Sequence, residues 1–474
     1  MNAVLRSGLS AAGLLLTSCS LAPAYVPPPI ASIPPSFKEE PGWEVARPSD
    51  SVARGEWWSM LRDPVLDRLE RTVAITNENV AAARAAYDAE RAIVIQERSS
   101  LFPSVTASAS AGTSPFSGGG SNAAAAAAGA KIVLAAEASW EADLWGRLHN
   151  SVTQARANAQ ASAGDLASAS LSAQAELATD YVQLRGTDAE RQLLDATVKA
   201  YTRALTIAAN KYNAGAVAHS DVYQAQVALS NAIASRQDLD RQRAILEHAI
   251  AVLTGENPST FALAPADWKP IVPVVPGILP ATLLERRPDI AAAERRVAAA
   301  NANIGIQRAA YFPQVTLSAA AGTGGSGFAQ LFSAATTLWS IGMSGLMTLL
   351  DSGRRHGQVL QARAQFDQAA AMYREAVLTA FQEVEDNLAA TRVLASVTQS
   401  RLSATEAANR AETIANNQYL DGIIDYAQVI VVQTGALNAR RSQIQAVVDQ
   451  QAAAIALIRA IGGSWAPAEE LPNA

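Results

Sequence analysis

Cysteine is nearly absent from this chain: among 474 residues the only one is Cys19. One cysteine cannot form a disulfide within the chain, and it excludes zinc clusters built from several thiolates. Histidine is scarce too, and Leu246-Glu247-His248 lacks the second histidine that a zinc-protease helix requires. The GxGxxG run at 322–327 leads toward another predicted strand instead of a helix, so it does not indicate dinucleotide binding. We predict that the protein is not an enzyme and binds neither a metal nor a dissociable cofactor.

Charged and aromatic residues are also few, at 17% and 6% of the chain, and the net charge is −6. Proteins that bind nucleic acid present a basic face, so this balance excludes nucleic acid as a partner. Apolar residues make up 49%, which excludes bulk disorder. Alanine alone supplies 102 residues, so few bulky side chains remain for a thick core. This composition favours long helices packed closely side by side.

The amino-terminal sequence has the features of a targeting signal. Arg6 is followed by a short apolar run at 9–16, too short to span a bilayer, and then by Leu16-Thr17-Ser18-Cys19. This run resembles a bacterial lipobox, which predicts a lipoprotein signal peptide at 1–18 and a covalent lipid on Cys19. An ordinary signal peptide with an incidental cysteine is the alternative. By resemblance to sorted lipoproteins, Ser20 favours the outer membrane. Residues 19–64 are predicted to form a lipidated, proline-rich extended tether.

A tandem duplication accounts for most of the chain. Residues 101–113 read LFPSVTASASAGT and residues 311–323 read YFPQVTLSAAAGT, which match at nine of thirteen positions. These two runs are 210 residues apart, and the correspondence continues downstream at an offset of 207. There His149 matches His356, each next to a Gly-Arg pair or its counterpart, which indicates structural roles for both histidines. We place the repeats at 65–257 and 281–465, with a proline-rich linker at 258–280 and a tail at 466–474.

Proline placement predicts very long helices. None occurs at 116–257 or 314–466, and an interior proline would cost a helix about 3 kcal/mol. We predict helices at 149–213 and 356–420, each about 98 Å long. Glycines at 215 and 422 then end these helices, and shorter return helices follow. Apolar residues at steps of three and four predict a coiled-coil seam in the second long helix: Phe366, Ala370, Tyr373, Val377, Ala380, Val384 and Leu388.

Each repeat also contains two predicted strands, at about 104–113 and 130–143 and at about 314–322 and 337–350, in which apolar and polar residues alternate. Strands of about ten residues with one apolar face fit an outer-membrane barrel, and half-buried hairpins on a soluble domain are the alternative. Four strands cannot close a barrel, and open edges are not tolerated in lipid. If the strands span the membrane, several chains must share one barrel, and a trimer would supply twelve strands.

Several runs in order carry a resemblance to a known family: the lipobox, Trp57-Trp58, Leu101-Phe102-Pro103, Trp140-Glu141-x-Asp143-Leu144-Trp145-Gly146-Arg147, Leu284-Glu285-Arg286-Arg287-Pro288-Asp289 and Gly462-Gly463-Ser464-Trp465. The chain resembles the TolC-like outer-membrane efflux proteins, specifically the NodT-type lipoproteins. The resemblance implies a mainly α homotrimer with a shared twelve-stranded barrel in the outer membrane and a coiled-coil tunnel in the periplasm.

The resemblance also implies a function. It predicts a passive exit duct for drugs or small solutes in a tripartite efflux pump. The implied partners are outer-membrane lipid, a periplasmic adaptor and an inner-membrane transporter of the resistance-nodulation-division type. One alternative is the outer-membrane duct of a type I protein secretion system. Another, from a different class, is a non-conducting, lipid-anchored periplasmic coiled-coil scaffold.

Two sets of residues are candidates for the duct itself. Glu137, Glu141 and Asp143 fall on the polar face of their strand and are expected to line the lumen, unless they pair with Arg147 or nearby backbone. At the periplasmic mouth, related proteins often carry an acidic ring, but the corresponding position here is Val431. We therefore expect a hydrophobic constriction with Asp421 or Asp425 near it, or simple packing of the hairpin tip.

Overall fold

The computed structural model describes residues 20–29, 37–39, 55–113, 130–273, 287–325 and 337–463. The chain forms two compact units. Of the described residues, unit 1 contains 20–29, 86–113, 130–163, 292–325 and 337–373, and unit 2 contains 37–39, 55–85, 164–273, 287–291 and 374–463. The predicted signal peptide, Cys19, most of the tether, part of the linker and the tail lie outside the described residues.

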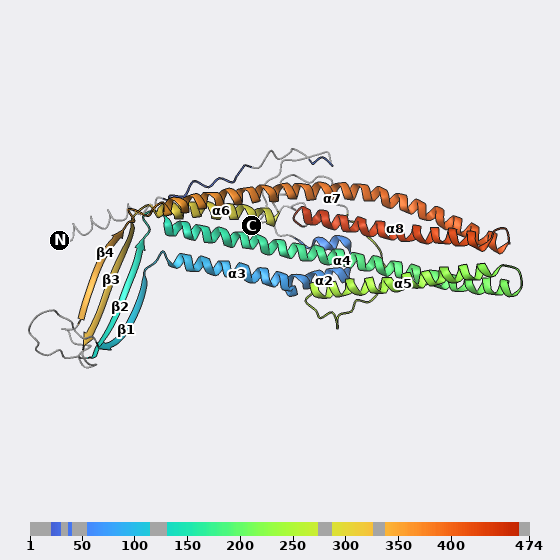
Figure 1. The fold of residues 1–474 in the computed structure, drawn as a ribbon, viewed down its shortest axis with the longest axis horizontal. Helices are drawn as coiled ribbons and strands as arrows, with labels where there is room; N and C mark the ends of the chain where they lie inside the picture. Colours follow the sequence, from blue (N-terminus) through green and yellow to red (C-terminus); the bar gives the residue numbers. More distant parts are fainter. Residues whose placement is uncertain are drawn as a thin grey trace, which may run out of the picture. The chain divides into compact units, whose positions relative to one another are not determined.

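Unit 1 contains one antiparallel sheet in the order β1-β2-β3-β4 (Figure 1). The strands are β1 (Ser104–Thr113), β2 (Ala130–Ala142), β3 (Gln314–Gly325) and β4 (Thr337–Leu346). The four predicted strands are confirmed, although β4 ends four residues before its predicted end at 350. The central pair joins the two repeats, with Ala138 opposite Ala319. In the described chain, β1 and β4 each pair on one side only.

The two faces of the sheet differ in polarity, as the alternation predicted. Val105, Ala138, Ala319 and Ile341 lie in register on one face, and Ile341 is 79% exposed in the single chain. Exposed Trp339 and Met343 share this face. The opposite face carries serines, threonines and glutamates. Within the described residues, the β4 part of the apolar face is therefore left largely uncovered.

The helices are α2 (Pro64–Thr76) and α3 (Glu78–Ser99) before β1, α4 (Arg147–Asn213) and α5 (His219–Leu253) after β2, α6 (Pro288–Ala309) before β3, and α7 (Arg354–Leu420) and α8 (Tyr426–Ala460) after β4. Both long helices begin two residues before their predicted starts and end at the predicted residues. Along the predicted seam of α7, every residue from Ala370 to Leu388 is buried. None of the helices in the described chain combines the length and continuous hydrophobicity that crossing a membrane requires.

The prediction of a tether up to residue 64 is wrong for its last part. Residues Trp57–Leu61 form a short 3-10 helix, η1, and Trp57 and Trp58 are only 3% and 6% exposed. They pack in the core of unit 2 with side chains from α2, α4, α5 and α8, including Leu66, Leu177, Ile250 and Ile455. Burial of two large aromatic side chains stabilises this segment, and the surrounding proline-rich composition gave no sign of it.

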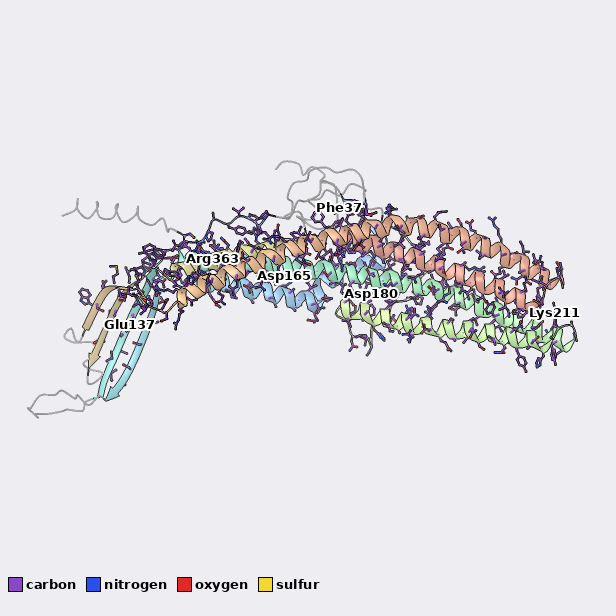
Figure 2. The ribbon with its side chains drawn as sticks, turned by 45° about the horizontal axis from the view of Figure 1, so that its top comes forward. Phe37, Glu137, Asp165, Asp180, Lys211 and Arg363 are labelled. Atoms are coloured by element: carbon purple, nitrogen blue, oxygen red, sulfur yellow. The ribbon has the colours of Figure 1, made fainter. Side chains whose placement is uncertain are left out.

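The described parts of the tether are extended but held. The Ser20 hydroxyl donates to Asn150 Oδ1 at 3.0 Å, and Asn301 Nδ2 donates to the Pro23 carbonyl at 2.9 Å. Both contacts lie in unit 1, where they fix residues 20–25 against α4 and α6. In unit 2, Phe37 packs on Phe381 of α7 with ring centroids 5.7 Å apart (Figure 2). Specific contacts therefore hold the tether at two places.

Candidate channel elements

Glu137 is an unpaired charge on the polar face of the sheet. It lies on β2 opposite Thr106 of β1 and Ala320 of β3, and its side chain is exposed (Figure 2). Among the described residues its carboxylate has no ion pair. Neighbouring positions on this face carry Ser104, Ser139 and other small side chains, which leave the carboxylate open to water.

Glu141 and Asp143, the two other predicted lumen residues, are paired locally. Glu141 accepts two bonds from Arg147, at 3.0 and 2.6 Å, and one from Gln314 Nε2 at 2.5 Å. Asp143 accepts from the backbone N–H and the ring Nδ1 of His149, at 2.8 and 2.7 Å. This is the local pairing that the sequence left open. The Asp143 carboxylate thereby provides an acceptor for a free backbone N–H in the first turn of α4 and holds the His149 ring in place.

Two aromatic residues, to which the sequence analysis assigned no role of their own, join the sheet to the helices. Trp145 stacks on Phe312 with centroids 4.6 Å apart, and its ring N–H donates to the Pro313 carbonyl at 2.8 Å. Together with Glu141 and Arg147, these residues line a cavity of about 310 Å³. The repeated Phe-Pro pair was the available signal, because it marks the start of a strand in each repeat.

The three residues predicted at the periplasmic mouth lie around the turn between α7 and α8, but their environments differ. Asp425 caps α8, with its Oδ1 accepting from the Gln428 N–H at 3.0 Å. Asp421 is exposed in the turn, and Val431 is 71% exposed on the first turns of α8. Beneath them Tyr419 and Tyr426 are buried with ring centroids 5.3 Å apart. Burial raises the pKa of the Tyr426 hydroxyl to about 12, so it stays neutral.

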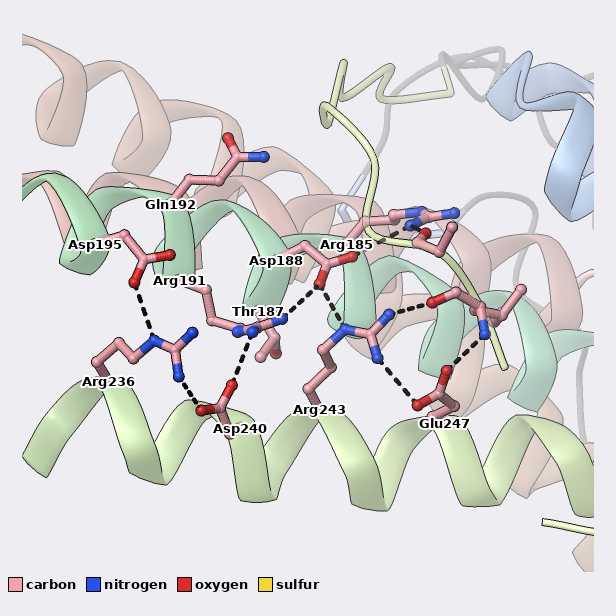
Figure 3. Close-up of polar contacts among 12 residues, drawn as sticks. Arg185, Thr187, Asp188, Arg191, Gln192, Asp195, Arg236, Asp240, Arg243 and Glu247 are labelled. Carbon is pink, nitrogen blue, oxygen red and sulfur yellow. Dashed lines mark hydrogen bonds and ion pairs between the residues drawn. The ribbon is translucent and has the colours of Figure 1, made fainter. Parts of the chain in front are cut away.

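A ladder of charged residues links α4 to α5 in unit 2 (Figure 3). Asp188, with a side chain only 1% exposed, accepts from Arg185 at 3.2 Å and from Arg243 at 2.8 Å. Arg185 also donates to the Ala264 carbonyl at 3.0 Å, which fixes the linker to the hairpin. Arg191 pairs with Asp240 at 2.8 Å farther along. These residues were not identified from the sequence, because the contacts that join α4 to α5 connect residues far apart in the chain, such as Arg243 and Asp188, 55 positions apart.

An open groove of about 520 Å³ lies in unit 2 between the α4–α5 hairpin and α8. Tyr201, Tyr223 and Val227 form one wall, and Ile430 and Thr434 belong to the other. Tyr223 is 62% exposed and packs against His219 with the rings tilted, and His219 stacks on Tyr212; the ring centroids are 4.5 Å apart in each pair. The groove is therefore mainly apolar with an aromatic border.

The model of the family described as "Outer membrane efflux protein" matches twice, at residues 71–256 and 279–463. The chain belongs to the outer membrane efflux protein family. The two matches lie over the two predicted repeats, which supports the duplication in this chain.

Individual relatives agree over nearly the whole length. The toluene efflux pump outer membrane protein TtgF of Pseudomonas putida is 29% identical, over 96% of both chains. Outer membrane protein OprJ of Pseudomonas aeruginosa is 27% identical, over 97% of this chain and 96% of its own. The solved structure of the outer-membrane channel OprN has a TM-score of 0.85 at 29% identity, covering 95% of this chain and all of that one. The protein is thus an outer-membrane efflux channel whose helices extend into the periplasm.

Proposed function

We propose that three copies of this chain form the passive exit duct of a tripartite efflux pump for small organic solutes. The observation that carries the proposal is the sheet with one unpaired edge on β1 and another on β4. In lipid, every backbone N–H and C=O needs a partner, so β1 of one copy must pair with β4 of the next. Three chains of four strands give an even-numbered barrel of twelve.

A covalent lipid on Cys19 would anchor each copy beside its own strands. Support comes from Ser20, whose bond to Asn150 holds the segment at the fourth residue of α4, shortly after β2. Metabolic labelling with palmitate should mark the native protein and leave a Cys19→Ala variant unmarked. Label on the variant would refute lipidation at this residue.

The adaptor is proposed to dock in the groove between the α4–α5 hairpin and α8. Its apolar walls and open length suit an amphipathic helix, which is bound by inserting apolar side chains into such a groove. The adaptor would connect the duct to an inner-membrane transporter, for which the resistance-nodulation-division type is our proposal. The names of the relatives support efflux over protein secretion, since TtgF is the outer membrane protein of a toluene efflux pump.

The lumen charge is proposed to come from Glu137, because Glu141 and Asp143 are engaged by Arg147 and His149. Three copies would place three unpaired carboxylates on the polar, inner face of the barrel. In planar bilayers, Glu137→Gln should lower the preference for cations over anions, while Glu137→Asp should retain it. An unchanged preference in Glu137→Gln would refute the lumen role.

The same bilayers test the function as a whole. The purified wild-type protein should insert as a heat-dissociable trimer and conduct ions. A protein that migrates only as a monomer and never conducts would be a scaffold and would refute the duct.

A further inference from the structure

The junction between the sheet and a long helix occurs twice in this chain. The first junction consists of residues 141–149, where β2 leads into α4, and at the offset of 207 it corresponds to the second junction, residues 348–356, where β4 leads into α7. Gly146 and Gly353 both have a positive φ, +72° and +92°, and the helix begins at the next residue in each case. The backbone therefore turns from strand to helix in a similar way at both junctions.

Arg354 takes the position of Arg147 at the second junction, but the acidic partner is missing there. Arg147 is bound by Glu141 at 2.6 Å, and the residue that corresponds to Glu141 is Thr348. The carboxylate that is nearest in sequence, Asp351, is bound at 2.6 Å by the arginine that follows Arg354. Arg354 is exposed and has no ion pair among the described residues. The second junction therefore carries an uncompensated positive charge.

Two further replacements make the second junction more apolar and less filled. Leu350 replaces Asp143 and is 87% exposed, so the exposed ring of His356 lacks the carboxylate that its counterpart binds. Ser352 replaces Trp145, whose large ring lines the cavity of about 310 Å³ at the first junction. Smaller and apolar side chains thus stand where the first junction has an indole ring and an acid.

In the proposed barrel, the adjacent copy completes the second junction. β1 and β4 are the outer edges of the sheet (Figure 1), so β1 of one copy lies beside β4 of the next as β3 lies beside β2 within a chain. At the offset of 210, Phe312 and Gln314 of the cavity correspond to Phe102 and Ser104. Phe102 is 62% exposed in the single chain. The repeat therefore predicts a counterpart of the cavity at each boundary between copies.

The residues that the repeat assigns to this boundary include hydroxyl groups from the adjacent copy. Two alanines that line the chain's own cavity correspond to Ser99 and Ser100. One acidic residue is also assigned to the boundary, because Thr348 of the chain's own cavity corresponds to Glu141 of the adjacent copy. Arg147 of that copy already binds this carboxylate. The positive charge of the second junction therefore stays uncompensated in the assembly.

We propose that each boundary between two copies holds a cationic site for an organic anion with an aromatic or other apolar body. The inference rests on the proposed trimer, because the site is incomplete in a single chain. Arg354 supplies the charge, Ser104 donates a hydrogen bond, and Phe102 and Leu350 provide apolar surface. Ser104 and Glu137 lie on the same face of the sheet, so the site opens into the duct.

Isothermal titration calorimetry of the purified trimer in an uncharged detergent tests the site, with 2-naphthalenesulfonate as the probe. The wild type should bind one anion per boundary, and Arg354→Gln should weaken binding about tenfold or more, because it removes the charged hydrogen-bond donor. The matched control is Arg401→Gln, which changes another exposed arginine of α7 far from the sheet and should bind like the wild type. Unaltered binding by Arg354→Gln, or equal affinity for the neutral 2-naphthalenemethanol, would overturn the site.

Two further variants test whether the site is shared between copies. Thr348→Glu restores the carboxylate of the first junction beside β4, and Ser104→Glu places one on β1, at the opposite edge of the sheet. Both should abolish binding, because each new carboxylate pairs with Arg354, once within a copy and once across the boundary. Loss of binding in Thr348→Glu but not in Ser104→Glu would overturn the shared site. A wild-type trimer that binds no anion would do the same while the duct stands, whereas a wild type without trimers or pores would refute the duct instead.

Discussion

At the scale of single residues, Glu70 of α2 is a buried carboxyl group in an unfavourable environment. Its side chain is fully buried, and neither carboxylate oxygen has a hydrogen-bond partner among the described residues. Burial, and secondarily the charge of Asp67, raises its pKa to about 9. The folded protein therefore holds this proton at pH 7, whereas the unfolded chain, with a glutamate pKa of about 4.3, does not.

This difference makes stability depend on pH in a definite direction. Between about pH 4.5 and 9 the folded state binds the extra proton, so stability falls as the pH rises, by up to about 1.4 kcal/mol per unit. Glu70→Gln keeps the shape without the titration, so its thermal midpoint should exceed that of the wild type increasingly from pH 5.5 to 8.5. Melting by circular dichroism measures this. Equal slopes for wild type and variant would contradict it, and exposed Glu406→Gln serves as the control.

At the scale of elements, one glycine sets how closely α4 and α8 approach. A Cβ at Gly186 would lie 2.3 Å from Cγ2 of Val448, whereas a Cβ at Gly357 of α7 would meet nothing within 4 Å. Alanine normally stabilises a helix by about 1 kcal/mol over glycine, but overpacking costs about 1–3 kcal/mol. We expect Gly186→Ala to lower the melting temperature, Gly357→Ala not to, and Val448→Ala to rescue Gly186→Ala. Failure of the rescue would refute this contact as the cause.

The charge ladder stabilises only one of the two hairpins. Asp188, Asp240 and Glu247 correspond to Ala395, Val447 and Ala454 in the second repeat, so α7 and α8 have no such ladder. Asp188→Asn would leave Arg185 and Arg243 buried without their shared carboxylate, at a cost of about 3–5 kcal/mol.

The control for this variant is Asp238→Asn, which alters a pair with Arg241 whose side chains are 51% and 63% exposed. Thermal melting should separate the two, with a clear loss for Asp188→Asn and none for Asp238→Asn. A melting temperature unchanged by Asp188→Asn would show that the ladder contributes nothing.

The elements themselves were mostly predictable, for local reasons. Proline-free alanine-rich stretches and the glycines at 215 and 422 located the long helices, and two-residue alternation after Phe-Pro located the strands. The break between α2 and α3 was not predictable. It depends on Asn77, whose amide donates to the Leu253 carbonyl at 2.9 Å, a partner 176 positions away. The contact between Asp188 and Arg243, 55 positions apart, was hidden for the same reason.

At the scale of the whole molecule, the internal repeat was the sequence feature from which most of the architecture could be predicted. Alternating strands that occur in both halves give four strands per chain, and four strands with open edges predict a barrel that several copies share. The sequence could not tell which acidic residues remain free. Glu137 and Glu141 alternate identically along β2, and only the position of Arg147 in space distinguishes them.

The outer edges of β1 and β4, unpaired in the described chain, also predict the effect of a defective gene copy that is expressed beside an intact one. A chain that cannot close a barrel alone forms one only together with other copies. A defective variant should therefore inactivate the intact chains with which it assembles. With equal expression and random mixing, about one assembly in eight would contain only intact chains. Co-expression of wild type with a Trp339→Asp chain, followed by conductance measurements on the purified mixture in planar bilayers, should thus reveal dominance, and full conductance despite mixed assemblies would argue against obligatory sharing.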